Sequence, residues 1–205
     1  MLHLHIHPEN PQARLITQAV ERIRAGDVVV YPTDAAYAIG CQIGNKHAME
    51  RIAQIRGLGP KHQYAIMCSD LSDIATYAKV DNATYRLLKA NTPSITTFIL
   101  TATSEVPKRL MHPKKRTIGL RIPSNPIVQA LLKELGEPLL TSTLILPDQT
   151  DPLDDPFDIE NQLSKRIDVF IDGGLGTLST TSIVDLSGDQ PEIVRRGVGD
   201  VSAFD

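Results

Sequence analysis

Small polar side chains follow a strongly apolar segment near the N-terminus, and they are the first candidates for chemistry. Residues 28–30 are three consecutive valines, a pattern that favours a buried strand. Pro32 ends this pattern, and Thr33 and Asp34 then offer a hydroxyl and a carboxylate at the strand end. Gly40 permits a close backbone approach nearby. The alternative is a strand, a turn and a second strand that bind nothing.

A basic loop and a separate arginine could bind an anion. Residues 55–62 contain two glycines, a proline and three basic side chains, which are Arg56, Lys61 and His62. Mobile cationic loops of this composition often close on phosphate, although a solvated surface turn explains the segment equally well. Arg121 ends an apolar strand pattern, where burial of its charge requires an anionic partner. That partner is either a substrate or an internal carboxylate.

Five cations within nine residues form the strongest local positive patch of an acidic protein. They are Lys108, Arg109, Lys114, Lys115 and Arg116. Such a patch can neutralise the phosphates of an RNA backbone, or it can be a solvated loop, and the sequence favours neither. No aromatic residue is interleaved with these cations, so base stacking is not predicted there.

The histidines and cysteines offer weaker signals. His3, His5 and His7 alternate with apolar residues, which places three imidazoles on one side of a strand and could hold a metal. Because no fourth ligand or acidic second shell is evident nearby, we predict a structural or solvent-facing strand and no metal site. Cys41 and Cys68 lack metal-ligand spacing, and a buried structural thiol at Cys68 is favoured over a catalytic one.

Composition narrows the class of protein. The chain has 205 residues, enough for one domain with a sizeable core, so we predict a single domain over residues 1–205. Its hydrophobic content of 41% and charged content of 22% are typical of globular proteins. No apolar run approaches the ~18 residues of a membrane span, and we expect a cytoplasmic protein with no membrane partner. The net charge of -3 argues against nonspecific binding of polyanions by the whole molecule.

Periodicity predicts the elements that must position the candidate residues. Apolar residues at helical spacing, with capping residues before them, predict helices that begin near residues 11, 45, 70, 81 and 126, and a short helix over 159–165. Apolar and β-branched runs predict strands over residues 3–7, 28–30, 64–68, 95–100, 117–122 and 168–172. Residues 148–158 are rich in aspartate and proline and are predicted to form a long exposed loop.

Five ordered segments, spanning nearly the whole chain, together resemble the YrdC/YciO family. They are the strand-turn around Thr33, the strand Thr117–Pro123 that ends in Arg-x-Pro, the segment Glu137–Pro147, the strand Thr180–Leu186 and the position of Arg195. The resemblance implies a YrdC-like α/β fold, in which a twisted mixed sheet is flanked by helices and carries a concave basic cavity. The best-known members of the family make threonylcarbamoyl-AMP from threonine, bicarbonate and ATP for tRNA modification.

The resemblance also assigns binding residues. It implies nucleotide or phosphate contacts at Arg56, Thr117 and Arg195, and amino-acid contacts at Thr33, Arg121, Thr143 and Thr181. Lys61 is added as a phosphate contact because it could supply the charge that is missing at position 58. Two departures are informative. Leu58 stands where active relatives carry the arginine of a Lys-x-Arg pair, and Ile145 stands where they carry the asparagine of Ser-Ala-Asn. The pattern looks most like the YciO branch, and it leaves the catalytic residues unassigned.

Two functional classes remain open. In the first, an enzyme of weak or altered specificity binds ATP with Mg2+, threonine and bicarbonate, and forms a threonylcarbamoyl-adenylate. In the second, the protein is a non-catalytic module for double-stranded RNA or tRNA, in which residues 108–116 add positive charge. RNA binding and nucleotide binding are compatible with each other. We therefore predict a protein that binds RNA and nucleotide, with the non-catalytic RNA-binding module as the alternative.

Overall fold

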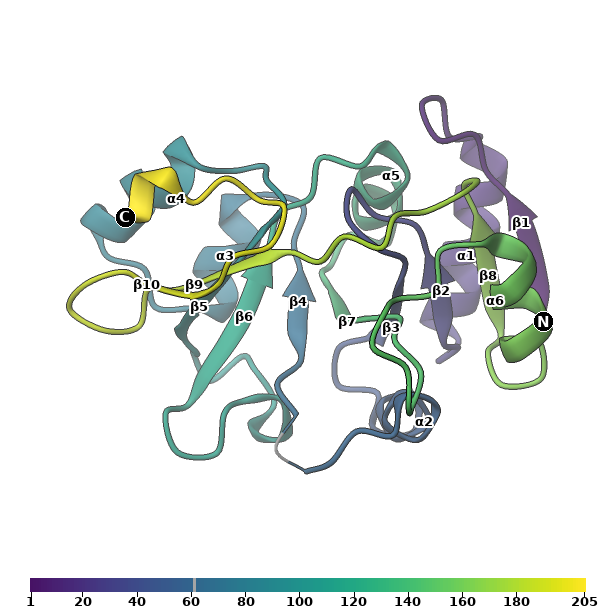
Figure 1. Ribbon diagram of the computed structural model, residues 1–205, viewed down its shortest axis with the longest axis horizontal. Helices are drawn as coiled ribbons and strands as arrows, with labels where there is room; N and C mark the ends of the chain where they lie inside the picture. Colours follow the sequence, from purple (N-terminus) through teal and green to yellow (C-terminus); the bar gives the residue numbers. More distant parts are fainter. Residues whose placement is uncertain (61) are drawn as a thin grey trace.

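The structure is a computed structural model that describes residues 1–60 and 62–205. Its centre is one mixed sheet whose ten strands follow the order β1-β8-β2-β3-β7-β4-β6-β5-β9-β10 (Figure 1). The strands are β1 (Leu2–His5), β2 (Val29–Tyr31), β3 (Ala38–Gln42), β4 (Ala65–Met67), β5 (Thr96–Thr101), β6 (Thr117–Arg121), β7 (Leu139–Thr143), β8 (Val169–Asp172), β9 (Ser182–Asp185) and β10 (Glu192–Arg195). The predicted α/β fold class, with a mixed sheet flanked by helices, is confirmed.

Six α-helices flank the sheet among the described residues, and most begin where capping residues predict. They are α1 (Ala13–Arg24), α2 (Lys46–Arg56), α3 (Leu71–Tyr77), α4 (Asn82–Ala90), α5 (Pro126–Leu135) and α6 (Pro156–Leu163). The side chains of Asn45, Asp70, Asp81 and Asn125 accept backbone N–H bonds at four of the helix starts. No described helix is long and apolar enough to cross a membrane.

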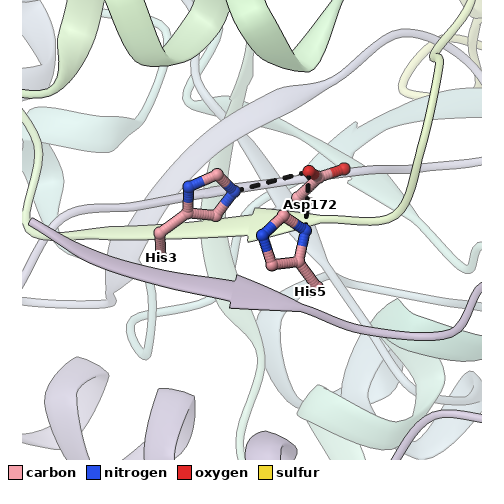
Figure 2. A group of neighbouring side chains, drawn as sticks. All are labelled: His3, His5 and Asp172. Atoms are coloured by element: carbon pink, nitrogen blue, oxygen red, sulfur yellow. Dashed lines mark hydrogen bonds and ion pairs between the residues drawn. The ribbon is translucent and has the colours of Figure 1, made fainter.

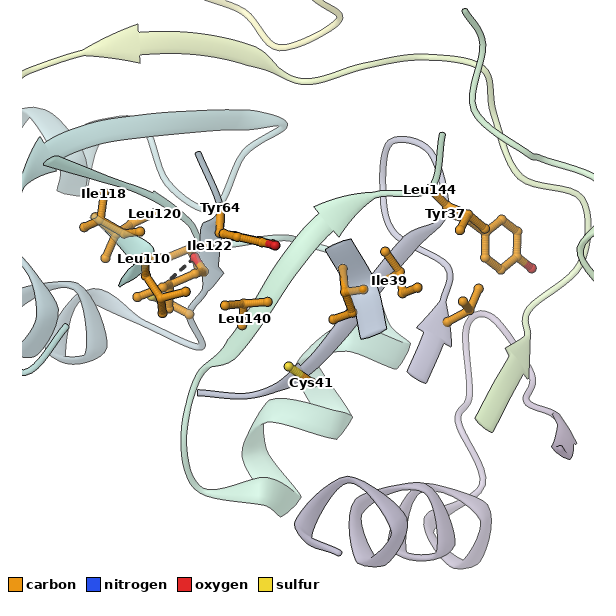
Figure 3. Close-up of a cluster of buried hydrophobic side chains, with 14 of the residues drawn as sticks. Tyr37, Ile39, Cys41, Tyr64, Leu110, Ile118, Leu120, Ile122, Leu140 and Leu144 are labelled. Carbon is orange, nitrogen blue, oxygen red and sulfur yellow. Dashed lines mark hydrogen bonds between the residues drawn. The ribbon is translucent and has the colours of Figure 1, made fainter. Parts of the chain in front are cut away.

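Alternation along the strands divides the core into two clusters. Ile39, Ile66, Phe98, Leu120 and Leu140 belong to the larger cluster, together with apolar residues of α2, α3, α4 and α6. Figure 3 shows part of this cluster, with side chains from several strands in contact. The opposite face of β1, β8 and β2 is covered by α1 and α5, which pack against each other. Each strand therefore sends alternate residues to opposite faces.

Small residues leave part of the second face hollow. Ala65 of β4 lies between Gly119 of β6 and Thr141 of β7, and Ala38 of β3 lies opposite Thr143. A Cβ atom at position 119 would lie 3.1 Å from Thr97 Cγ2 and 3.4 Å from Ala65 Cβ. Because these neighbouring strands carry little side-chain volume here, the sheet itself forms the floor of a cavity.

A segment after β8 crosses the sheet and forms one side of this cavity. Residues 173–181 run across the front of the sheet from β8 to β9 (Figure 1). The Tyr37 hydroxyl donates to the Gly174 carbonyl at 2.7 Å and accepts the Gly173 N–H at 3.1 Å. The Ala36 N–H donates to the Ser179 carbonyl at 3.0 Å. The turn after β2 and the crossing segment are thus held together by hydrogen bonds.

Candidate ligand-binding site

The hollow face of the sheet forms a cavity of about 340 Å³. This volume lies in the range of small-molecule sites. Among the predicted site residues, Thr33, Arg56, Arg121, Thr143, Thr181 and Arg195 all line it. These residues come from widely separated parts of the chain, and none of the described lining residues is an aspartate or glutamate. The cavity is therefore rich in hydroxyl groups and positive charge.

Arg121 is the most deeply buried of the three arginines, and it already has a carboxylate partner. Its Nη2 forms an ion pair with Asp34, whose other oxygen accepts the N–H and the hydroxyl of Ser124, each at 3.0 Å. Burial lowers the pKa of Arg121 to about 10, so the guanidinium stays charged at neutral pH. The internal salt bridge is the alternative that the structure bears out. Arg121 Nε is buried and has no hydrogen-bond partner among the described residues.

Arg56 reaches the cavity from the last turn of α2, and its partners in the described part of the chain are uncharged acceptors. Its Nε donates to the Ile145 carbonyl at 3.0 Å, and its Nη1 donates to Ser142 Oγ at 2.5 Å. It forms no ion pair with any described carboxylate. Although burial lowers its pKa, an arginine stays protonated in a protein. Its positive charge is therefore fixed in position and not neutralised.

Arg195 contributes a second guanidinium without a described carboxylate partner. Its Nε donates to the Thr181 carbonyl at 2.9 Å, and its Nη2 donates to Thr181 Oγ1 at 3.1 Å. Thr181 therefore orients Arg195, and its hydroxyl is already engaged in a hydrogen bond. Thr33 is engaged as well, because its hydroxyl donates to the Ala36 carbonyl at 2.7 Å and accepts the Ala35 N–H at 2.9 Å. Both threonines shape the wall through their own hydrogen bonds.

Leu58 is absent from the cavity wall for a reason that lies in the helix cap. Gly57 adopts a left-handed conformation with φ 63°, its N–H donates to Gln54, and the Leu58 N–H donates to Ala53. This is a Schellman motif, in which the residue after the glycine packs an apolar side chain against the helix. Leu58 packs against the larger core cluster. Leu58, at the family's arginine position, therefore contributes to core packing and not to the cavity wall. Ile145, in contrast, lines the cavity.

The loop after α2 carries less charge than its sequence suggests. His62 Nε2 lies 3.3 Å from Ser142 Oγ, and its ring lies edge-on to Tyr64. Burial and the neighbouring Arg56 lower the pKa of His62 to about 4, so this imidazole is neutral at pH 7. The interpretation of residues 55–62 as a segment of three cations is thus wrong for His62. Lys61 lies outside the described residues.

The remaining predicted contacts lie away from the cavity. Thr117 is on the same face of β6 as Gly119 but is not a lining residue; it is buried opposite Thr101. The five cations of residues 108–116 are exposed and do not line the cavity either. One of them, Lys115, lies 3.8 Å from the carboxylate of Asp185. The assignment of Thr117 as a nucleotide contact therefore has no support from its position.

Sequence reasoning missed the residues that build the wall between the predicted contacts. Ser142 joins Arg56 to His62, and Ala65 and Gly119 supply the empty floor. The sequence does indicate the floor in retrospect. Ala65 and Gly119 each stand between large apolar residues of their strand, so the face opposite the core carries little side-chain volume. Cys68 is buried, and burial raises the pKa of its thiol well above the usual range, as expected for a structural cysteine.

The prediction of a strand without a metal site at the N-terminal histidines assumes that no acidic residue lies near them, and the structure corrects this assumption. Asp172 of β8 lies beside His3 and His5 (Figure 2). Glu160 of α6 lies beside His3. These acidic residues are more than 150 positions away in the sequence, so no local pattern could reveal them. His7 lies beyond β1, where its ring accepts the N–H groups of Glu9 and Asn10.

Fold and cavity together define an α/β protein whose open sheet face carries an arginine- and hydroxyl-lined site. A family model described as "Telomere recombination", which covers Sua5, YciO and YrdC proteins, matches residues 21–197. The chain is 53% identical over 200 residues to the uncharacterized protein YciO of Escherichia coli K12, covering 98% of this chain and 97% of that protein. The chain therefore belongs to the Sua5/YciO/YrdC family.

The chain also resembles more distant relatives in sequence and solved structures in fold. A threonylcarbamoyl-AMP synthase of Vibrio vulnificus is 26% identical over 164 residues, which cover 78% of this chain and 87% of that protein. The crystal structure of E. coli YciO matches with a TM-score of 0.95 at 52% identity and full coverage of both chains. Sua5 of P. abyssi, complexed with L-threonine, matches with a TM-score of 0.87 at 21% identity, covering 96% of this chain and 58% of that one.

Proposed function

We propose that the cavity binds ATP together with threonine, and that the protein carries out a weak or altered form of threonylcarbamoyl-adenylate synthesis. The observation that carries this proposal is the pairing of two arginines, Arg56 and Arg195, in one cavity whose described lining contains no carboxylate. An anionic ligand is the missing counter-charge of such a site. The relatives named threonylcarbamoyl-AMP synthases supply the reaction class.

The two arginines without a described carboxylate partner suit a polyphosphate. Each guanidinium is oriented by uncharged acceptors, Arg56 by Ser142 and Ile145 and Arg195 by Thr181. Fixing a planar guanidinium in advance lowers the entropy cost of binding an anion. A triphosphate offers enough oxygens to contact both groups, and pyrophosphate would leave from the same place after attack at the α-phosphorus.

An amino acid would fit beside the turn after β2. The Arg121 Nε is a buried donor without a partner among the described residues, and the Thr143 hydroxyl lines the cavity nearby in the sheet. A carboxylate or carbamate oxygen is an acceptor of the kind that Nε lacks. The P. abyssi relative was solved with L-threonine, which makes threonine the first amino acid to test, with bicarbonate as the carbon source.

Two side chains argue for weak or altered activity. Leu58 packs in the core, and Ile145 presents a butyl group to the cavity where active relatives carry a hydrogen-bonding amide. A charge-assisted hydrogen bond contributes about 1.5–3 kcal/mol. Losing two such contacts without compensation lowers binding or rate by about a hundredfold to ten-thousandfold. A slow adenylate synthesis, or one with another acceptor, is the expected outcome.

Magnesium would be held by the nucleotide rather than by the protein. Mg2+ usually binds one or two carboxylates together with substrate phosphates and water. No described residue that lines the cavity carries a carboxylate, and Asp34 is already committed to Arg121 and Ser124. In this proposal Mg2+ therefore enters as the Mg-ATP complex, with phosphates and water as its ligands.

Pyrophosphate release tests the enzymatic proposal. Purified protein at high concentration is incubated with Mg-ATP, threonine and bicarbonate, and each substrate is omitted in turn. We expect slow release that depends on all three, and a further loss of at least tenfold in Arg195→Ala, whose exposed position spares the fold. Arg86→Ala on the exposed surface of α4 is the matched control. Absence of pyrophosphate release at any enzyme concentration would contradict the proposal.

RNA binding is a second candidate function, and a separate observation favours it. All five cations of residues 108–116 are exposed, and only Lys115 is paired with a described carboxylate. Backbone contacts by such a patch would be led by shape and sensitive to salt. In Figure 1 the loop that carries them lies at the same lower end of the sheet as the loop after α2.

Filter binding of duplex RNA over a salt series tests this candidate. We expect Lys108→Ala/Arg109→Ala to weaken binding and to reduce the salt slope by about two phosphate contacts. Arg86→Ala/Lys89→Ala removes two exposed cations from α4 and should leave binding unchanged. Undetectable binding at low salt, or equal losses in both double variants, would remove the patch as an RNA site.

A further inference from the structure

The edge of the sheet that lies away from the cavity brings together two histidines and two carboxylates. His3 and His5 come from β1, and Asp172 comes from β8 (Figure 2). Glu160 comes from α6. None of these residues lines the cavity, so the family reaction leaves this group unexplained. We propose that His3, His5 and Asp172 form a binding site for a divalent transition metal, with Zn2+ as the best fit.

Strand register explains why the three side chains converge. β1 pairs in parallel with β8, so that His5 lies opposite Asp172 and His3 lies opposite Phe170. Because side chains alternate along a strand, all of these residues share one face, while Leu4 and Ile171 are buried in the smaller cluster on the other face. The sheet therefore fixes the spacing of the group before any ion binds.

The distances fit a metal site. His3 Nε2 lies 3.4 Å and His5 Nδ1 lies 3.0 Å from the same oxygen of Asp172, Oδ2. One nitrogen or oxygen atom from each residue lies within 4.8 Å of the others. Tetrahedral Zn2+ with bonds of about 2.0–2.1 Å separates its ligands by about 3.3 Å. Small side-chain movements would then suffice to place an ion between the three atoms.

Outer contacts hold two of the three ligands in the required orientation. Glu160 Oε1 lies 3.3 Å from His3 Nδ1, on the far side of the ring from Asp172. Metal-binding histidines commonly donate their second N–H to a carboxylate in this way, which leaves the other nitrogen free for the ion. The Gly174 N–H donates to Asp172 Oδ1 at 2.9 Å and so directs Oδ2 toward the histidines.

The site is accessible, and its ligand set selects the class of metal. The His5 side chain is 76% exposed, whereas His3 and Asp172 are 21% and 14% exposed. An ion could enter from the His5 side and keep water as its fourth ligand. Two imidazoles and one carboxylate suit Zn2+, Ni2+ or Cu2+ far better than Mg2+ or Ca2+. Binding would tie the edge strand β1 to β8.

Zinc titration of the full chain without a purification tag tests the site. Isothermal titration calorimetry with Zn2+ alone, in a buffer free of chelators, phosphate, ATP and RNA, should give one ion per chain. Co2+ in place of Zn2+ should give the visible absorption of a tetrahedral site. We expect His3→Ala and Asp172→Asn each to weaken Zn2+ binding at least tenfold, and Glu160→Gln to weaken it about tenfold through the orientation of His3.

His7→Ala is the matched control, because His7 lies in the same N-terminal segment but outside the cluster. It should bind Zn2+ like the parent chain. His5→Gln keeps the proposal testable if the more buried variants fail to fold, since the His5 side chain is mostly exposed. Absence of Zn2+ binding by the parent chain, or equal affinity in His3→Ala, His5→Gln and His7→Ala, would overturn the proposal. The readout is independent of ATP chemistry.

Discussion

Two groups of residues that position cavity arginines do so in opposite ways. In the Asp34 region, made of Asp34, Arg121 and Ser124, a buried guanidinium is matched by an internal carboxylate. In the Arg56 region, made of Arg56, His62, Ser142 and Ile145, the guanidinium donates only to uncharged acceptors among the described residues. The first region is electrically complete without a ligand, and the second is not. The positive charge available to an incoming anion therefore lies at Arg56 and at Arg195.

Breaking the ion pair in the Asp34 region should give the largest effect. Asp34→Ala leaves Arg121 charged and 5% exposed, without its partner. Removing one member of a buried pair typically costs about 3–5 kcal/mol in the free energy of unfolding. Urea denaturation should show this loss, whereas Asp34→Asn/Arg121→Met, which removes both charges, should lose less than Asp34→Ala. Equal stability of Asp34→Ala and the parent chain would mean that the two regions do not differ.

Removing the charge of the Arg56 region should affect ligand binding. Arg56→Ala deletes a guanidinium that has no described carboxylate partner, so no opposite charge is left buried. We expect ATP affinity to fall about tenfold to a hundredfold, from the loss of about 1.5–3 kcal/mol. Calorimetric titration measures the affinity, and Arg86→Ala is the control for the loss of one positive charge. An unchanged affinity in Arg56→Ala would place the anion elsewhere.

Acid should reduce the contribution of the Arg56 region to the stability of the fold. The pKa of His62 is lowered from 6.5 to about 4 in the folded protein, so the unfolded chain binds the proton more readily between these values. This contribution to stability is complete above pH 6.5 and is lost as the pH falls toward 4. We expect a loss of about 1 kcal/mol, below the full value of the shift because the ring is partly exposed.

Comparing the parent chain with His62→Gln isolates that contribution from the other titrating groups. Urea denaturation at several pH values between 4 and 7 should show a steeper decline for the parent chain than for the variant. Parallel curves would show that His62 is not the group that couples stability to pH in this region.

The smallest expected effect tests whether the Arg56 region is an incomplete version of the site in active relatives. Ile145→Asn places an amide on the cavity wall while the backbone carbonyl of residue 145 can still accept from Arg56. Because the wall around residue 145 is not shaped for an amide, we expect the new side chain to recover only about 0.5–1.5 kcal/mol of the missing contact, so ATP affinity should rise about twofold to tenfold. Ile183→Asn, also on the cavity wall, controls for added polarity. Equal gains in both variants would contradict a specific role for position 145.

Local sequence signals were sufficient for most elements. Capping side chains at Asn45, Asp70, Asp81 and Asn125 marked helix starts because a cap satisfies backbone donors only a few residues away. The start of α6 was missed, since Pro156 opens it inside the segment predicted to be an exposed loop. In that segment Leu153 is buried and its N–H donates to Leu144, a contact that local composition could not indicate.

The sequence by itself determined the mixed α/β fold, the family and the identity of the arginines that line the cavity, because these follow from periodicity and from ordered motifs. Only the tertiary structure decided which charges remain available. Asp34 neutralises Arg121 across 87 positions, burial makes His62 neutral, and strand pairing brings Asp172 to His3. The reason is physical: charge state and ligand geometry depend on distances and burial, and residues remote in the chain set both.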